Sequence, residues 1–136
     1  MSDSNLSEIT LYEVKKSKVA RIRLARKGIT GDMAKEIVNQ VDRDLMCRVL
    51  GVDPSTLARY VKRKRLTTAV SETMLDLLTT VELAQSIWEE RRGALQRMEE
   101  PIVALGNESP IDLMDTFEGR RWVREILHKI EVGDFS

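Results

Sequence analysis

The stretch at residues 44–66, "DLMCRVLGVDPSTLARYVKRKRL", decides how the N-terminal half of this chain folds. Its glycine, Gly51, separates two runs with helical spacing and supplies the left-handed residue of a tight turn. In the "DPST" that follows, Asp53 has the position of a helix N-cap, and the proline that of the first helical residue. Asp42 or Asp44 is placed to cap the preceding helix. The pattern therefore predicts a helix-turn-helix, two short helices joined by a glycine turn.

A small residue is required four positions before the turn glycine, because the two helices cross closely there. Cys47 occupies this place, and a cysteine packs as a small apolar residue. We therefore interpret Cys47 as a packing residue in preference to a reactive thiol. Apolar side chains are expected to hold the two helices together: Leu50, Val52, Leu57 and Tyr60.

The second helix of this pair has the features of a recognition helix, whose first residues meet base edges in the major groove. Four basic residues in a row follow it, at the end nearest the phosphates in this docking mode. The helix dipole explains one or two of these cations, but not all four. We therefore favour DNA binding over a purely structural helical hairpin. The expected DNA-contacting residues are Asp53, Ser55, Thr56, Ala58, Arg59, Lys62, Arg63, Lys64 and Arg65.

A basic segment precedes this pair of helices. It begins at Thr10, whose spacing to Glu13 is that of a capping box, and it stops at Gly28. We predict a helix here, although "ARIRLA" alternates apolar and basic residues and leaves a strand open. A further helix is predicted from Thr30 through "GDMAKEIVNQV". Its core face comprises Met33, Ile37, Val38 and Val41.

The composition as a whole favours an all-α fold. The 136 residues include three prolines and seven glycines, and apolar residues recur at three- and four-residue spacing over long stretches. We expect about six or seven helices around one core. The N-terminus lacks the features of a leader, and no apolar run approaches the ~18 residues of a membrane span. The single cysteine forms no internal disulfide, so we expect a cytoplasmic protein without a membrane partner.

The zero net charge conceals two oppositely charged halves. Residues 1–66 carry 15 Lys and Arg against 8 Asp and Glu, whereas residues 67–136 carry 7 against 14. We expect a basic DNA-binding part at 1–66 and an acidic part with a different partner at 67–136. The alternative is that the two sets of charges attract each other within the fold.

The acidic half begins with the pattern of one long helix at residues 67–92, capped by Thr67 or Thr68. Its broad apolar face is expected to pack on both halves, and "EERRGALQRMEEP" is interpreted as the connection that follows. In "VALGNESPIDLMDTFEGRRWVREILHKIEVGDFS", Ser109 and Thr116 are expected helix caps. The apolar stripe of the last helix comprises Gly119, Val123, Ile126, Leu127 and Ile130.

This last segment resembles the toxin-binding domain of Xre/MbcA/ParS-type antitoxins, closely over residues 94–136. With an Xre-type helix-turn-helix before it, the resemblance covers nearly the whole chain from about residue 20. Asn107 stands where the family often has a second glycine, and asparagine tolerates the left-handed backbone of that turn. The residues that agree in order and spacing are Ala94, Leu95, Pro101, Ala104, Leu105, Gly106, Pro110, Leu113, Thr116, Gly119, Val123, Leu127, Ile130, Glu131 and Gly133.

The resemblance implies a type II antitoxin that silences a RES-domain or related toxin attacking NAD and represses its own operon. We expect a homodimer, because two-fold symmetry matches the two half-sites of a palindromic operator, and a hetero-oligomer with the toxin. The alternative is a free-standing repressor whose C-terminal half only dimerises or senses a ligand. The implied toxin-binding residues are Leu105, Gly106, Pro110, Gly119, Val123, Leu127, Ile130, Gly133, Asp134, Phe135 and Ser136.

The tail after Gly133 has a specific role by this resemblance, because it points toward the active-site cleft of the toxin. Phe135 offers a flat ring, and Asp134 and the terminal carboxylate offer two negative charges to a cleft that binds NAD. The alternative is a tail whose Phe135 folds back on the last helix.

Catalysis by the chain itself is not expected. His128 has no second histidine or cysteine at ligand spacing, which argues against a metal site. Ser109 and Asp112 are better interpreted as caps than as a nucleophile and its partner, and no G-x-x-x-x-G-K phosphate loop occurs. We therefore expect no enzyme activity, no cofactor and no bound metal.

Overall fold

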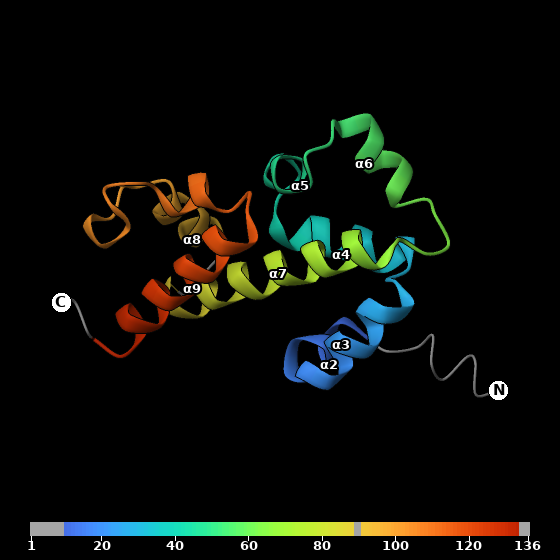
Figure 1. Ribbon diagram of the computed structural model, residues 1–136, viewed down its shortest axis with the longest axis horizontal. Coiled ribbons are helices and arrows are strands. Elements are labelled where there is room, and N and C mark those ends of the chain that lie inside the picture. The colour runs from blue at the N-terminus through green and yellow to red at the C-terminus, as the bar shows by residue number, and fades with distance from the viewer. Residues whose placement is uncertain (1–9, 89–90, 134–136) are drawn as a thin grey trace.

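The computed structural model describes residues 10–88 and 91–133, and these residues form an all-α fold, as predicted. Eight α-helices and two short 3-10 helices lie in the described ranges, more than the six or seven helices expected, and no strand occurs there (Figure 1). No helix in these ranges has both the length and the apolar character needed to cross a membrane. The elements are α2 (Leu11–Lys16), α3 (Lys18–Lys27), α4 (Gly31–Val41), α5 (Arg43–Leu50), α6 (Pro54–Tyr60), α7 (Thr68–Trp88), α8 (Arg91–Met98), η1 (Val103–Leu105), η2 (Pro110–Leu113) and α9 (Phe117–Glu131).

The basic N-terminal segment forms two helices, because Ser17 interrupts it. The Thr10 and Glu13 side chains form the predicted capping box at the start of α2. Ser17 ends α2 in an extended conformation and caps α3, since its Oγ accepts a hydrogen bond from the Ala20 amide. Gly28 ends α3 with φ of 93°, a left-handed conformation that favours glycine. The strand that "ARIRLA" left open is wrong.

The three helices that follow begin where the sequence predicted, and α4 and α5 also end there. The side chain of Thr30 caps α4, and that of Asp42, not Asp44, caps α5. Gly51 ends α5 with φ of 68°. Asp53 then caps α6 by accepting a hydrogen bond from the Thr56 amide. The two helices and the glycine turn of residues 43–60 are therefore confirmed as elements of structure.

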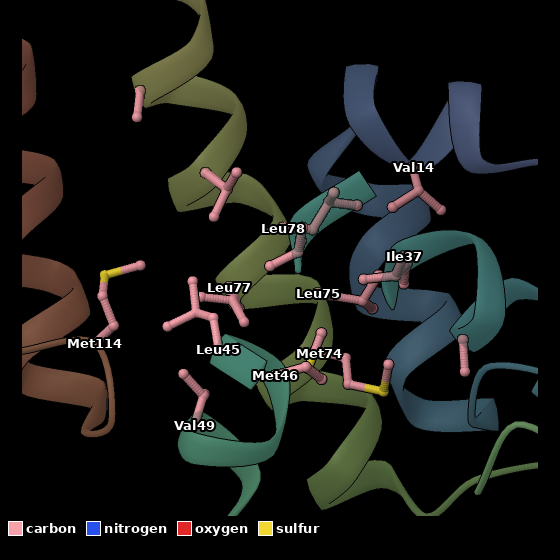
Figure 2. Packing of buried hydrophobic residues seen from close by; sticks show 14 of the residues in the cluster. Val14, Ile37, Leu45, Met46, Val49, Met74, Leu75, Leu77, Leu78 and Met114 are labelled. Carbon is pink, nitrogen blue, oxygen red and sulfur yellow. The ribbon is translucent and has the colours of Figure 1, made fainter. Parts of the chain in front are cut away.

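The long helix α7 runs through the middle of the molecule (Figure 1). On its sides pack α3, α4 and α5 from the basic half and α8 and α9 from the acidic half. Figure 2 shows Met74, Leu77 and Leu78 of α7 between Ile37 of α4 and Met114. All these side chains are buried and belong to one hydrophobic cluster. One core therefore serves both halves of the chain.

The acidic half differs from the prediction in two places. A separate helix, α8, starts at Arg91 within the span predicted for the long helix and its connection, and its Ala94 and Met98 are fully buried one turn apart. Ser109 stands at the N-cap of η2 with Pro110 in the first turn, as predicted, but its side chain forms no capping hydrogen bond. The Ser109 carbonyl accepts the first hydrogen bond of the 3-10 helix η2, from the Asp112 amide. The Ser109 hydroxyl donates instead to the Glu99 carbonyl at 2.8 Å.

The turn and the last helix agree with the prediction. Gly106 and Asn107 both have a left-handed backbone, with φ of 67° and 66°, as expected of the asparagine. Thr116 caps α9 by accepting a hydrogen bond from the Gly119 amide at 2.9 Å. Val132 follows α9, and Gly133 has φ of 79°. The apolar stripe of α9 faces the core.

Candidate functional site

Polar side chains at the start of α6 form one hydrogen-bonded chain. Asp53 Oδ1 accepts from the Thr56 amide at 2.8 Å and from the Ser55 hydroxyl at 2.9 Å. The Thr56 hydroxyl accepts from Arg59 Nη2 at 3.0 Å. Asp53, Ser55, Ala58 and Arg59 are exposed, and Thr56 is half-buried. These hydrogen bonds therefore link predicted base-contacting residues along the whole of α6, from Asp53 at its N-cap to Arg59 in its last turn.

The same hydrogen bonds set the charge state of Asp53. The amide of Thr56 donates to its carboxylate, and this bond, with that from the Ser55 hydroxyl, lowers the pKa of Asp53 below the ordinary 3.8. The nearby Arg59 guanidinium acts in the same direction. Asp53 is therefore a carboxylate at neutral pH and accepts hydrogen bonds only. Amino groups, such as those on the base edges of cytosine and adenine, are donors that fit such an acceptor.

The packing that positions α6 involves the apolar residues predicted for the helix pair. Cys47 is 9% exposed, and burial raises the pKa of its thiol, as suits a packing residue. Leu57 is buried, and Leu50, Val52 and Tyr60 are half-buried against the core.

The four basic residues after α6 have different surroundings. Lys62, Arg63 and Lys64 are exposed, and the Arg63 guanidinium lies 5.0 Å from the centre of the Tyr60 ring. Arg65 is half-buried, and its Nη1 donates to the Gly28 carbonyl at 2.7 Å. Arg65 therefore has a structural role, since it fastens this loop to the end of α3.

Several residues implied to bind a toxin lie in the core of the acidic half. The side chains of Leu105, Val123 and Leu127 are at most 1% exposed, and Pro110 is buried. Gly119 lies against the Leu113 carbonyl with no room for a Cβ. These side chains cannot touch another protein without unfolding, so they shape the surface from beneath.

Other residues of this half are available to a partner. Gly106 and Gly133 are exposed and Ile130 is half-buried, whereas Asp134, Phe135 and Ser136 lie outside the described residues. Four exposed apolar side chains were not predicted: Val103, Phe117, Trp122 and Val132, with exposed fractions of 83%, 64%, 40% and 76%. The prediction came from residues that agree with the family in order and spacing, and these four exposed side chains are not among them.

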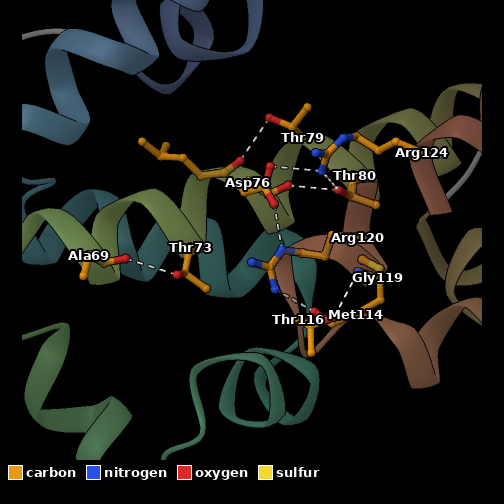
Figure 3. Close-up of polar contacts among 11 residues, drawn as sticks. Ala69, Thr73, Asp76, Thr79, Thr80, Met114, Thr116, Gly119, Arg120 and Arg124 are labelled. Carbon is orange, nitrogen blue, oxygen red and sulfur yellow. Dashed lines mark hydrogen bonds and ion pairs between the residues drawn. The ribbon is translucent and has the colours of Figure 1, made fainter. Parts of the chain in front are cut away.

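A polar network joins α9 to α7, and sequence reasoning also missed it (Figure 3). Arg120 is 5% exposed; its Nε contacts Asp76 Oδ2 at 2.7 Å, and its Nη1 donates to the Met114 carbonyl at 2.8 Å. Arg124 Nη1 contacts Asp76 Oδ1 at 3.0 Å and donates to the Thr80 hydroxyl at 2.7 Å. Both oxygens of one carboxylate on α7 therefore hold two arginines of α9. Asp76, Arg120 and Arg124 also line an open groove of about 620 Å³ between α3, α7 and α9.

Among the described residues, two ion pairs connect the basic half with the acidic half. Lys15 of α2 contacts Glu82 of α7 at 2.8 Å, and Arg48 of α5 contacts Asp112 of η2 at 2.9 Å. The attraction of the two halves within the fold, left open above, therefore accounts for part of the charge asymmetry.

The side chains considered for catalysis have structural partners. The Ser109 hydroxyl is bonded to the Glu99 carbonyl, Asp112 is paired with Arg48, and exposed His128 lies 3.4 Å from Glu131. In the described part of the chain, no group of three or more His, Cys, Asp or Glu side chains is placed to hold a metal ion.

Comparison with known proteins identifies the acidic half. Residues 83–133 match the family model of the antitoxin Xre/MbcA/ParS C-terminal toxin-binding domain, which adds the last turns of α7 to the predicted segment. The Prs ADP-ribosylating antitoxin of Sphingobium sp. (strain YBL2) is 29% identical over 132 residues, covering 88% of this chain and 83% of that protein. Residues 83–133 are therefore a toxin-binding domain of the Xre/MbcA/ParS type, and the chain as a whole is similar to an antitoxin.

Proposed function

We propose that this antitoxin neutralises a RES-domain toxin that consumes NAD, and that it represses its own operon by binding DNA. The match of residues 83–133 to a toxin-binding domain carries the first part of the proposal. The name of the Sphingobium relative couples an antitoxin to ADP-ribosylation, a reaction in which NAD donates ADP-ribose. A toxin cleft shaped for NAD is the target that this chemistry suggests.

The toxin-binding surface that we propose has a rigid base and an exposed rim. Val123 and Leu127 anchor α9 in the core, and the Asp76 network fixes that helix on α7. The rim comprises the exposed Gly106 and Gly133 with the half-buried Ile130. A docked helix held in one orientation loses little conformational entropy on binding, which favours affinity.

The tail is the proposed inhibitory element, on the ground of family resemblance. Phe135 and Asp134 would occupy the cleft in which the toxin holds NAD, so that inhibition is direct occlusion. Deletion of residues 134–136 should then abolish or weaken neutralisation while the thermal unfolding curve stays unchanged. If the truncated protein protects NAD as well as the full chain, the docked surface alone inhibits.

Co-expression with the product of the adjacent gene tests the antitoxin function. We expect growth arrest and falling NAD when that gene is expressed alone, and rescue with co-purification when this chain is present. Expression without arrest, or failure to co-purify, would favour a free-standing repressor whose C-terminal half only dimerises or senses a ligand. A toxin of another chemistry would arrest growth with NAD unchanged.

For DNA binding, we propose that residues 1–66 form the reading part and residues 67–136 the toxin-binding part, with α7 shared. The capped α6 with exposed Arg59 and the cations that follow it support this proposal. A homodimer would place two α6 helices in successive major grooves about 34 Å apart. Arg59→Ala should lower discrimination between operator and random DNA, whereas Lys62→Ala should weaken binding to both equally. A variant lacking Lys62–Arg65 that binds the operator normally would refute this assignment.

A further inference from the structure

The end of α3 is fastened to the loop that follows α6, although the two are far apart in the sequence. The Leu66 amide donates to the Ile29 carbonyl at 2.9 Å, and the Gly31 amide donates to the Arg63 carbonyl at 3.0 Å. Arg65 adds its 2.7 Å bond to Gly28. Figure 1 shows this loop beside the segment that joins α3 to α4, at the end of the molecule that also carries α6.

Close backbone contact makes this junction rigid. A Cβ at Gly28 would collide with the Leu66 carbonyl, and a Cβ at Gly31 would collide with carbonyls of Val61 and Arg63. Two glycines therefore let the two segments pack at backbone distance. The backbones of the two segments therefore keep a fixed position relative to each other.

The junction brings into backbone contact two segments that each carry exposed cations. Arg26 and Lys27 are exposed in the last turn of α3, and Lys62 and Lys64 are exposed in the loop. None of these four side chains forms an ion pair with another residue in the described ranges. The exposed carboxylates nearby in the chain are Asp32 of α4 and Glu72 of α7.

Such a surface favours an anionic partner, because unpaired like charges held together repel one another. We propose that Arg26 and Lys27 form one phosphate-binding surface with Lys62 and Lys64, so that α3 grips the DNA backbone beside the groove read by α6. This inference rests on the DNA binding proposed above, and continuity with that interface selects DNA as the occupant. The footprint thus includes a helix outside the helix-turn-helix.

Each phosphate contact releases counterions, so the slope of log K against log salt measures the number of contacts, with about 0.9 per phosphate. We expect the double variant Arg26→Ala/Lys27→Ala to flatten the slope by about 1.8, as two lost contacts require. The backbone bonds of the junction do not involve these side chains, and alanine favours a helix, so the fold should persist.

Binding of the full chain to a random-sequence DNA duplex is measured by fluorescence anisotropy, with the chain alone and with the adjacent-gene product. The NaCl concentration is varied from 50 to 200 mM, about the range in which phosphate contacts are resolved. The matched control is Arg121→Ala/Lys129→Ala, which removes one arginine and one lysine from the exposed face of α9. We expect the control to keep the wild-type slope. The double variant Lys62→Ala/Lys64→Ala reports separately on the loop.

The outcomes separate this inference from the proposed function. A flattened slope for Lys62→Ala/Lys64→Ala with a wild-type slope for Arg26→Ala/Lys27→Ala would overturn the inference and leave DNA binding intact. Absence of salt-dependent binding by the wild type would overturn both. A change of oligomeric state in Arg26→Ala/Lys27→Ala, with an unchanged slope, would assign the surface to a second copy and overturn the inference.

Discussion

The carboxylate of Asp76 should be the polar group whose removal costs this protein the most stability. Asp76→Ala leaves Arg120 without its charged partner at a position that is 5% exposed, and it also removes the partner of Arg124. A buried cation without a counter-charge is strongly unfavourable, because the protein interior screens and solvates it poorly.

The magnitude follows from burial. Loss of one partner of a buried pair costs about 3–5 kcal/mol, and the Asp76 side chain is 23% exposed, which places the expected loss near the lower limit, about 3 kcal/mol. Arg120→Met keeps the apolar stem but removes the guanidinium and leaves the Met114 carbonyl without that donor, for about 2 kcal/mol. The stability lost by the double variant should be smaller than the sum of the two single losses by about 1 kcal/mol or more. That sum counts the loss of the Asp76–Arg120 ion pair twice.

Urea unfolding followed by circular dichroism measures these free energies. The control is Arg121→Met on the same helix, since Arg121 is 67% exposed and lies 3.8 Å from Glu125, an arrangement worth about 0.5 kcal/mol or less. If Asp76→Ala destabilises no more than this control, or if the effects of Asp76→Ala and Arg120→Met simply add, the network does not hold α9 to α7 as we reason.

Four further expectations concern single sites. Gly31→Ala should lower the free energy of unfolding by about 1–3 kcal/mol in urea titrations, because its Cβ meets backbone carbonyls; wild-type stability would contradict this. Asp112→Asn should change stability by about 1 kcal/mol or less, since its pair with Arg48 is exposed; a larger loss would show strong coupling of the halves. Burial and a raised pKa should make Cys47 react with a thiol reagent more slowly than free cysteine at pH 8, about the pH of such assays, and equal rates would contradict its packing role. The lowered pKa of Asp53 makes its charge stabilise the fold above pH 3.8, so the advantage of wild type over Asp53→Asn should vanish as pH falls below that value; a pH-independent difference between their unfolding free energies would refute it.

Much of the local structure could be predicted from the sequence, because caps and turns depend on residues three or four positions apart. Thr10, Asp53 and Thr116 cap the helices that follow them, and Gly51 makes the turn between α5 and α6. Where two local signals competed, the prediction was less secure. Ser109 precedes a proline, as a helix cap often does. Its hydroxyl does not cap the 3-10 helix η2, however, and donates to the nearby Glu99 carbonyl.

The candidate sites were predictable in part. The order of residues in the acidic half pointed to the toxin-binding family, and the position of α6 pointed to Arg59 and its neighbours. The residues matched to the family include Val123 and Leu127, which also form the buried stripe of α9, whereas exposed Trp122 is absent from the match. A spacing rule does not distinguish a residue that contacts a partner from one that supports it.

The sequence by itself determined the all-α class, the caps at Thr10, Asp53 and Thr116, and the core faces of α4 and α9, since these follow from short-range spacing and apolar periodicity. Only the tertiary structure decided the roles of individual charged side chains. Arg120 of α9 meets Asp76 of α7, Arg65 turns inward to Gly28, and Arg26 lies exposed at the same junction. These partners are separated by 37 to 44 positions, and their meeting depends on which surfaces the apolar core brings together. In a chain with 32% charged residues, each charge has many possible partners, and burial in the folded molecule selects among them.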